Sequence, residues 1–199
     1  MGDRYGPMVV ARRPWNQAEL RSKRIAIPGI MTSAYLALKL FQPEFEHVVV
    51  PFDEIIGVVQ RGEVDGGLLI HEGQLIYARE GLHKIVDLGE WWHETTELPL
   101  PLGGNAIRRD LGIERIREIS RLLRESIQYA LDHREEALKH AMKYARDLDT
   151  QLADRFVGMH VNTRTLDYGE EGRRAVQLFL DKAYERRLIP HSVCAEFTD

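Results

Sequence analysis

Short apolar runs alternate with stretches of helical spacing over the first half of the chain. Five runs are brief, rich in branched residues and bounded by glycine, proline or charge, as strands buried on both faces are: 7–11, 24–28, 47–51, 66–70 and 84–88. Between them, residues 32–41 and 52–62 have helical spacing, with Thr32 placed to cap the first helix and Gly62 to end the second. This alternation predicts an α/β fold with a mostly parallel sheet.

After residue 108 the pattern becomes helical. Apolar residues recur at spacings of three and four, as in Ile116, Ile119, Leu123, Ile127 and Ala130, which predicts helices that pack through one face. The expected helices cover residues 113–134, 135–148, 150–162 and 171–187. The proline- and glycine-rich segment 98–104 lies between the two regimes and fits a hinge or a crossover strand better than a helix.

Composition narrows the function classes. The chain has 199 residues, 44% of them hydrophobic, and a formal net charge of -4, so it can bury a core. Its lysines and arginines are spread along the sequence, which argues against nucleic acid as a partner. No run of 18 apolar residues and no signal peptide are found, and Cys194 is the single cysteine, so we expect a cytoplasmic protein without membrane contact.

His71 is the first candidate for chemistry. It follows the apolar run 66–70, and a residue just beyond the carboxyl end of such a strand stands at the mouth of the ligand crevice in α/β folds. An imidazole there could accept a proton near neutral pH. Gly66 and Gly67 would let another backbone or a ligand approach the strand closely. The alternative is that His71 only forms local hydrogen bonds.

Thr32 and Ser33 mark the second candidate. Pro28 and Gly29 end a strand, and the two hydroxyl residues open a helix, so that free backbone N–H groups and the helix dipole could bind a carboxylate or phosphate. The lysine of a phosphate-binding P-loop is missing. The alternative is a plain helix cap.

The remaining motifs give weaker indications of a functional site. The histidines lack the spacing of metal ligands, and no nucleophile elbow surrounds a serine, so we expect neither a metal site nor covalent catalysis. Trp91 and Trp92 could line a pocket, but paired aromatic residues after a strand more often pack in a core or between lobes.

Five segments together resemble the 1,4-dihydroxy-6-naphthoate synthase family of the futalosine route to menaquinone. They are "IPGIMTSAYLALKLF", "IHEGQLIYAREGLHKIVDLGEWW", "LPLPLGGNAIRRDLG", "SIQYAL" and "VNTRTLDYGEEGRRAV". "DLGEWW" followed by "LPLPLGG" is the most specific part, and it argues against the sister family, chorismate dehydratase.

The resemblance implies a two-lobed fold like that of type II periplasmic binding proteins, with the site between the lobes. It implies a smaller α/β lobe over residues 15–103, with 1–14 and 104–199 forming the remainder of a larger, helix-rich lobe. It also implies a lyase that converts cyclic dehypoxanthinyl futalosine into 1,4-dihydroxy-6-naphthoate without a metal or organic cofactor. His71 matches the family's proton-accepting histidine, and Thr32 and Ser33 match its substrate-contacting pair.

The chain departs from the family pattern in two places. Family members begin with a further segment of about a quarter of the protein, so we expect this sequence to be N-terminally truncated. The family commonly has tyrosine where His160 stands, and the sequence assigns His160 no role. The partners we expect are a small-molecule substrate and, as an open alternative to a monomer, further copies of the chain. A cytoplasmic carboxylate-binding module without catalysis, or a chorismate dehydratase-like relative, remains the alternative function.

Overall fold

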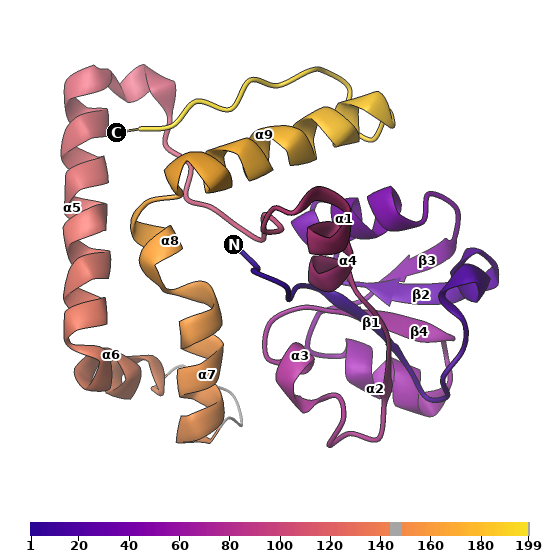
Figure 1. The fold of residues 1–199 in the computed structure, drawn as a ribbon. Helices are drawn as coiled ribbons and strands as arrows, with labels where there is room; N and C mark the ends of the chain where they lie inside the picture. The colour runs from indigo at the N-terminus through magenta and orange to yellow at the C-terminus, as the bar shows by residue number, and fades with distance from the viewer. Residues whose placement is uncertain (144–148, 199) are drawn as a thin grey trace.

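A five-stranded sheet fills the part of the molecule built from the first half of the chain (Figure 1). The computed structural model describes residues 1–143 and 149–198. The strands lie where the apolar runs predict them: β1 (Met8–Ala11), β2 (Arg24–Ile27), β3 (Glu46–Val49), β4 (Gly66–Leu69) and β5 (His83–Asp87). Their order across the sheet is β3-β2-β4-β1-β5.

The sheet is mixed: β2, β3, β4 and β5 share one direction, as the alternation of strands and helices predicts, but β1 runs against them. β2 runs parallel to β3 and β4, and β1 runs antiparallel to β4 and to β5. The prediction that grouped residues 1–14 with the helical half differs from the structure here, because β1 lies inside the sheet. Its side chains explain the position: Val9, Val10 and Ala11 are buried, and only an inner strand is buried on both faces.

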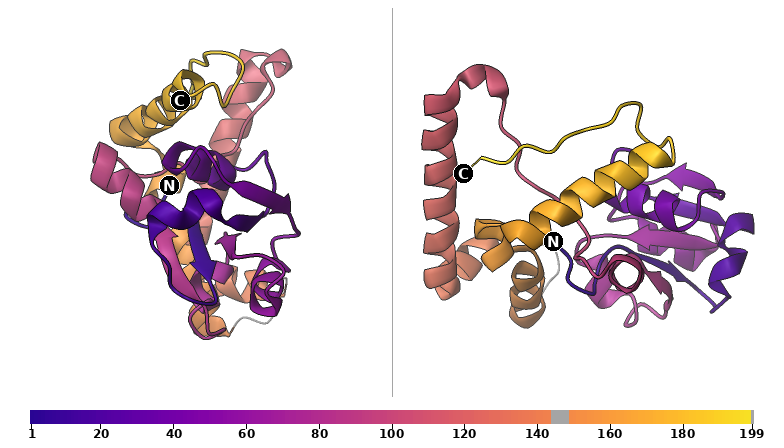
Figure 2. Two further views of the ribbon diagram at one scale, coloured as in Figure 1. Left: turned by 90° about the vertical axis from the view of Figure 1, so that its right-hand side faces the viewer. Right: turned by 45° about the horizontal axis from the view of Figure 1, so that its top comes forward.

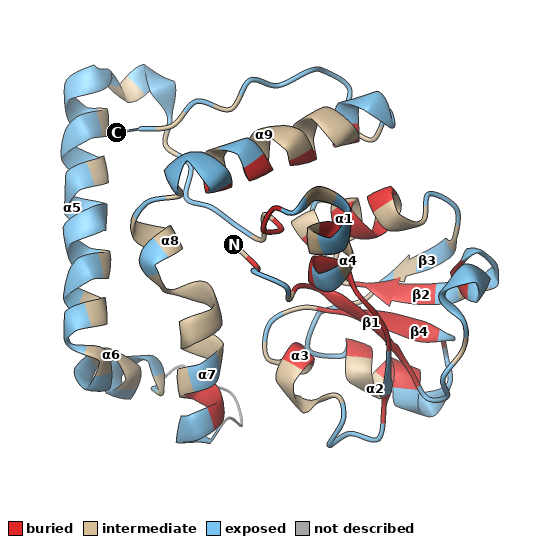
Figure 3. Cartoon of the chain, in the orientation of Figure 1, coloured by how far each residue is buried: buried red, intermediate tan, exposed pale blue. Residues whose placement is uncertain are grey.

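The two faces of the sheet have separate apolar layers. Val9, Ile25 and Leu68 face a cluster that includes α1 (Ser33–Phe41) and α4 (Leu88–Thr96), while Val10 and Ala26 face α2 (Ile55–Arg61). This alternation follows the two-residue period of a strand. Figure 3 shows the burial concentrated in the strands and in these helices.

The two glycines at the start of β4 serve packing within the protein. A Cβ added to Gly66 would stand 2.9 Å from the carbonyl oxygen of Val10, and one added to Gly67 would stand 2.5 Å from Cγ2 of Ile55. The sequence predicts that another backbone or a ligand approaches the strand at Gly66 and Gly67. In the structure the backbone of β1 and the side chains of α2 occupy this space.

α4 and α9 (Gly169–Glu185) join the sheet region to the C-terminal half. The buried ring of Trp92 packs edge-on against Phe179 of α9, with 5.4 Å between centroids, and Trp91 packs against Phe41 at 5.3 Å. The tryptophan pair therefore belongs to the core and to the contact between the two halves.

The C-terminal half is a set of helices beside the sheet region (Figure 2). They are α5 (Ile113–Asp132), α6 (Arg134–Ala141), α7 (Thr150–His160), α8 (Thr163–Leu166) and α9. α5 packs only loosely through the predicted face: Ile116, Ile127 and Ala130 are half-buried on the side that contacts α8, whereas Ile119 and Leu123 are exposed and none of its residues is fully buried. The helix stands at the far side of the molecule from the sheet (Figure 1). Part of the predicted helix 135–148 lies outside the described residues.

Short elements complete the described chain: η1 (Gln17–Ser22), α3 (Gly73–Ile76) and η2 (Arg109–Leu111). The segment 98–104 contains no helix, as predicted, and buried Leu100 forms a β-bridge with Gly2 through two backbone hydrogen bonds of 2.8 and 2.9 Å. No helix among the described residues is long and apolar enough to cross a lipid bilayer.

Candidate active site

The carboxyl ends of β2 and β4 lie at one edge of the sheet. Ile25 pairs with Gly66 and Ala26 with Gly67 in parallel register, so that the loops following the two strands leave the sheet side by side. The first loop, 28–32, leads to the helix start at Thr32 and Ser33, and the second presents His71. The fold therefore brings the two candidates predicted from the sequence to the same edge.

The imidazole of His71 is exposed and lies among aromatic rings. Its centroid is 5.0 Å from that of Phe52, which follows β3, and 6.2 Å from that of Phe156 in α7. Among the described residues the His71 ring makes these contacts but no hydrogen bond; the local hydrogen bonds of His71 are made by its backbone, with Gln74. Both ring nitrogens are left available to a ligand.

The backbone of His71 is held in an unusual conformation. Its φ is 53°, in the left-handed region, which non-glycine residues rarely adopt. The buried side-chain amide of Gln74, in the orientation that satisfies both of its hydrogen bonds, accepts from the His71 N–H at 3.2 Å and donates to the Gly6 carbonyl at 2.7 Å. Gln74 thus fixes the loop to the segment that leads into β1. Strain of this kind is often found at functional sites.

Thr32 and Ser33 are both occupied by hydrogen bonds within the protein. Thr32 caps α1, since its hydroxyl donates to the Gly29 carbonyl at 2.8 Å and accepts from the Tyr35 N–H at 3.1 Å. The Ser33 hydroxyl donates to the carbonyl of Leu102, in the segment that crosses between the halves. Thr32 therefore caps α1, whereas Ser33 ties the helix start to the crossing segment.

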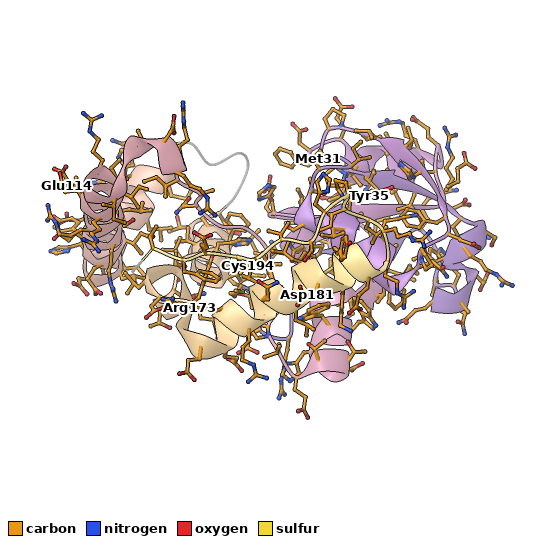
Figure 4. The ribbon with its side chains drawn as sticks, turned by 90° about the horizontal axis from the view of Figure 1, so that it is seen from above. Met31, Tyr35, Glu114, Arg173, Asp181 and Cys194 are labelled. Atoms are coloured by element: carbon orange, nitrogen blue, oxygen red, sulfur yellow. The ribbon has the colours of Figure 1, made fainter. Side chains whose placement is uncertain are left out.

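Large apolar side chains stand open to solvent in the loop before α1. Met31 is 94% exposed and Ile30 is 57% exposed. Figure 4 shows Met31 at the margin of the sheet region that is turned toward the C-terminal helices. Exposed apolar groups that gather in one place often mark a ligand-binding groove.

α7 faces this edge from the other half of the chain. Asp149 caps the helix by accepting from the Leu152 N–H at 2.8 Å, and it also lies 3.9 Å from the guanidinium of Arg79, in the turn after α3. The hydroxyl of Tyr5 donates to the carbonyl of Met159. Together with the contact between His71 and Phe156, these interactions place α7 against the loop that carries His71 (Figure 1).

A buried carboxylate ends β5 near the same edge. Asp87 is 5% exposed and accepts from the backbone N–H groups of Gly89 and Glu90 at 2.8 and 3.2 Å. Burial raises its pKa from 3.8 to about 6, although these two hydrogen bonds work in the opposite direction. Its contacts are those of a helix cap for α4.

Sequence reasoning missed the two aromatic neighbours of His71. Phe52 follows the strand at 47–51, so the rule that selected His71 could have selected Phe52 as well. Phe156 lies within a predicted helix, and nothing local tells which face of that helix meets the sheet region. Among the described residues, no group of three or more histidine, cysteine or acidic side chains is placed to hold a metal ion.

Structural comparison shows the fold. A crystal structure of a protein from Archaeoglobus fulgidus is similar over 94% of this chain and 70% of its own, with a TM-score of 0.90 and 49% sequence identity. The alkanesulfonate-binding protein SsuA from Xanthomonas axonopodis is similar over 96% of this chain and 68% of its own, with a TM-score of 0.66 and 14% identity. The fold is thus the one found in periplasmic binding proteins.

Sequence comparison shows the family. The family described as Menaquinone biosynthesis matches residues 1–185. The 1,4-dihydroxy-6-naphthoate synthase of Thermus thermophilus is 45% identical over 192 residues, which cover 96% of this chain and 70% of that protein. The synthase of the same name from Streptomyces coelicolor is 37% identical over 196 residues, or 96% and 69% of the two chains. The chain therefore belongs to the menaquinone biosynthesis family that includes the 1,4-dihydroxy-6-naphthoate synthases.

Proposed function

We propose that the protein is a carbon–carbon lyase that converts cyclic dehypoxanthinyl futalosine into 1,4-dihydroxy-6-naphthoate and releases a small sugar-derived fragment, with His71 as the general base. The observation that carries the proposal is the position of the His71 ring. It is exposed, has no hydrogen bond to the described residues, and lies between Phe52 of the sheet region and Phe156 of α7. Membership of the menaquinone biosynthesis family supports the substrate class.

A base in this position suits the reaction. Breaking a carbon–carbon bond by removing a proton needs one well-placed acceptor, and an imidazole accepts a proton near neutral pH. The Gln74 side chain accepts a hydrogen bond from the backbone N–H of His71. The loop is therefore held in place without any hydrogen bond to the nitrogens of the imidazole ring. Formation of an aromatic product supplies driving force for the step.

The start of α1 would bind an oxygen of the substrate. The hydroxyl groups of Thr32 and Ser33 donate hydrogen bonds to backbone carbonyls of the protein. In this proposal the two residues therefore shape the loop. The backbone N–H groups of Ser33 and Ala34 have no partner among the described residues, and N–H groups at a helix start stabilise a carboxylate or an oxygen that gains charge. Ile30 and Met31 would cover the apolar face of the ring system.

Incubation with the proposed substrate tests the reaction. The purified protein is mixed with cyclic dehypoxanthinyl futalosine, and the naphthoate is detected by mass spectrometry, with heat-denatured protein as the control. Formation of the naphthoate supports the lyase. A carboxylate-binding module would return the compound unchanged, so calorimetric binding without product would overturn the proposal.

We further propose that the enzyme works in the cytoplasm. Cys194 is the single cysteine and is exposed, so the chain forms no internal disulfide and suits a reducing compartment. Fractionation of cells followed by detection with an antibody would test this, and recovery from a cell-surface fraction would contradict it.

A further inference from the structure

His160 ends α7 on the side that carries Phe156. Its ring lies 4.5 Å from the ring of Phe156 between centroids, at an angle of 40°. Phe156 in turn contacts His71 at 6.2 Å. The result is a row of four rings, Phe52, His71, Phe156 and His160, in which the first two come from the sheet region and the last two from α7. Two imidazoles, one from each half of the chain, therefore flank a single phenyl ring.

The contacts of His160 define its tautomer. Nδ1 lies 3.0 Å from the carbonyl oxygen of Phe156, and a carbonyl can only accept, so in this contact Nδ1 carries the hydrogen. In the neutral ring Nε2 is then a hydrogen-bond acceptor, and it has no partner among the described residues. Because Nδ1 is turned back onto the helix, Nε2 is directed away from it. The backbone is fixed as well, since the His160 carbonyl accepts from the Thr165 hydroxyl at 2.9 Å.

The surroundings of His160 favour the neutral ring. Burial is the largest cause that lowers its pKa, and the neighbouring imidazole of His71 lowers it further, whereas the hydrogen bond to Phe156 raises it. The influence of His71 also means that the two imidazoles lie within electrostatic reach of each other. A neutral imidazole with a free Nε2 is a good acceptor for a hydroxyl group.

We propose that His160 is a substrate-binding residue of the same site, and that its Nε2 accepts a hydrogen bond from a hydroxyl group of the molecule held against His71. This inference rests on the proposed function and deepens it, because it assigns a contact to the hydroxyl-bearing, sugar-derived part of the substrate. His71 removes the proton, and His160 fixes the orientation of the molecule from the other half of the chain.

Two variants separate the hydrogen bond from the packing. His160→Phe keeps a ring against Phe156 but removes the acceptor, whereas His160→Gln keeps an acceptor near the position of Nε2. His83→Phe is the matched control, since His83 is exposed at the opposite end of β5. Binding of cyclic dehypoxanthinyl futalosine is measured by titration calorimetry, together with kcat, KM and the unfolding temperature of each variant.

We expect His160→Phe to raise Kd and KM about tenfold, the loss typical of one hydrogen bond, with kcat changed less than about threefold. His160→Gln and His83→Phe should stay within about threefold of the wild type in Kd. The limb of the pH profile that reports the base should be the same in all variants, because His71 is intact.

The outcomes distinguish the two proposals. Equal binding by the wild type and by a folded His160→Phe protein overturns the role of His160 alone. A large loss of kcat with unchanged Kd also overturns it, because His160 would then act in the chemical step. If the wild type binds the compound and His160→Phe binds it more weakly, but no naphthoate forms, the contact stands and the lyase proposal fails. Absence of binding by the wild type overturns both.

Discussion

The rings of His71 and Phe156 lie 6.2 Å apart between centroids, although one residue follows β4 and the other lies in α7. This contact brings the proposed base against the other half of the chain. A substrate seated at the sheet edge would therefore touch both halves, and the position of α7 would decide how the base meets it. The relationship gives the proposed site its testable consequences.

Replacing the proposed base should stop the chemistry and leave binding. Asparagine is the best substitute because it tolerates the left-handed φ of 53° better than other non-glycine residues. We expect His71→Asn to lower kcat about 10²- to 10⁴-fold and to change Kd less than about tenfold. His83→Asn, at the far end of β5, should behave as the wild type. Turnover by His71→Asn at the wild-type rate would remove His71 from the mechanism.

The Ser33 hydroxyl should contribute to stability through its hydrogen bond to the Leu102 carbonyl. Ser33→Ala should lower the free energy of unfolding by about 1 kcal/mol, measured by urea denaturation. Ser22→Ala is the matched control, because Ser22 donates to the Glu19 carbonyl at 2.8 Å in an exposed turn and should matter less. Equal losses of unfolding free energy in the two variants would mean that the hydrogen bond from Ser33 to the crossing segment adds no more stability than an exposed one.

Asp87 should make stability depend on pH. Its pKa is about 6 in the folded protein and 3.8 ordinarily, so between these values the folded state binds more protons than the unfolded state. The contribution of Asp87 to the free energy of unfolding therefore falls as pH rises from about 4 to about 6, by on the order of 2 kcal/mol. Asp87→Asn keeps an oxygen that can cap α4, but its amide does not titrate, so the variant should not lose this stability as the pH rises.

Denaturation of the wild type and of Asp87→Asn at several pH values provides the measurement. The stability of the variant relative to the wild type should increase over that interval and level off above it. A difference that is constant from pH 4 to pH 7 would contradict the raised pKa of Asp87.

Gly67 should not tolerate a side chain. A Cβ there would stand 2.5 Å from Cγ2 of Ile55 and 2.9 Å from Cγ2 of Val59, so Gly67→Ala must push α2 away from the sheet. We expect a loss of about 1–3 kcal/mol in the free energy of unfolding. Gly103→Ala, where a Cβ would meet nothing within 4 Å, should have little effect. A stable Gly67→Ala protein would show that α2 can shift freely.

The strands and most helices could be predicted because their pattern is local. Buried runs such as 24–28 and 66–70 became β2 and β4 almost unchanged. The place of β1 could not be predicted, because its own residues do not say that it pairs antiparallel between β4 and β5. α4 was missed although Asp87 supplies a cap and Leu88, Trp91 and Trp92 have helical spacing, because nine residues are too few for this spacing to repeat.

The candidate site was predictable to the same extent. His71 and the start of α1 follow from the rule that ligands bind at the carboxyl ends of parallel strands. Their surroundings do not follow from it: the ring contacts to His71 depend on where α7 docks, and the Ser33 hydrogen bond depends on the path of residues 98–104. Such contacts join segments far apart in the sequence, and local patterns carry no information about them.

The place of β1 between β4 and β5 has a consequence for how the chain reaches its native state. Met8 can pair only after Leu69 and Asp87, far along the chain, have come close to it, so this part of the sheet closes late and refolding should be slow. Until then β4 and β5 expose unpaired edges to which other molecules could attach. Loss of the early strand would therefore favour aggregation over a stable partial fold.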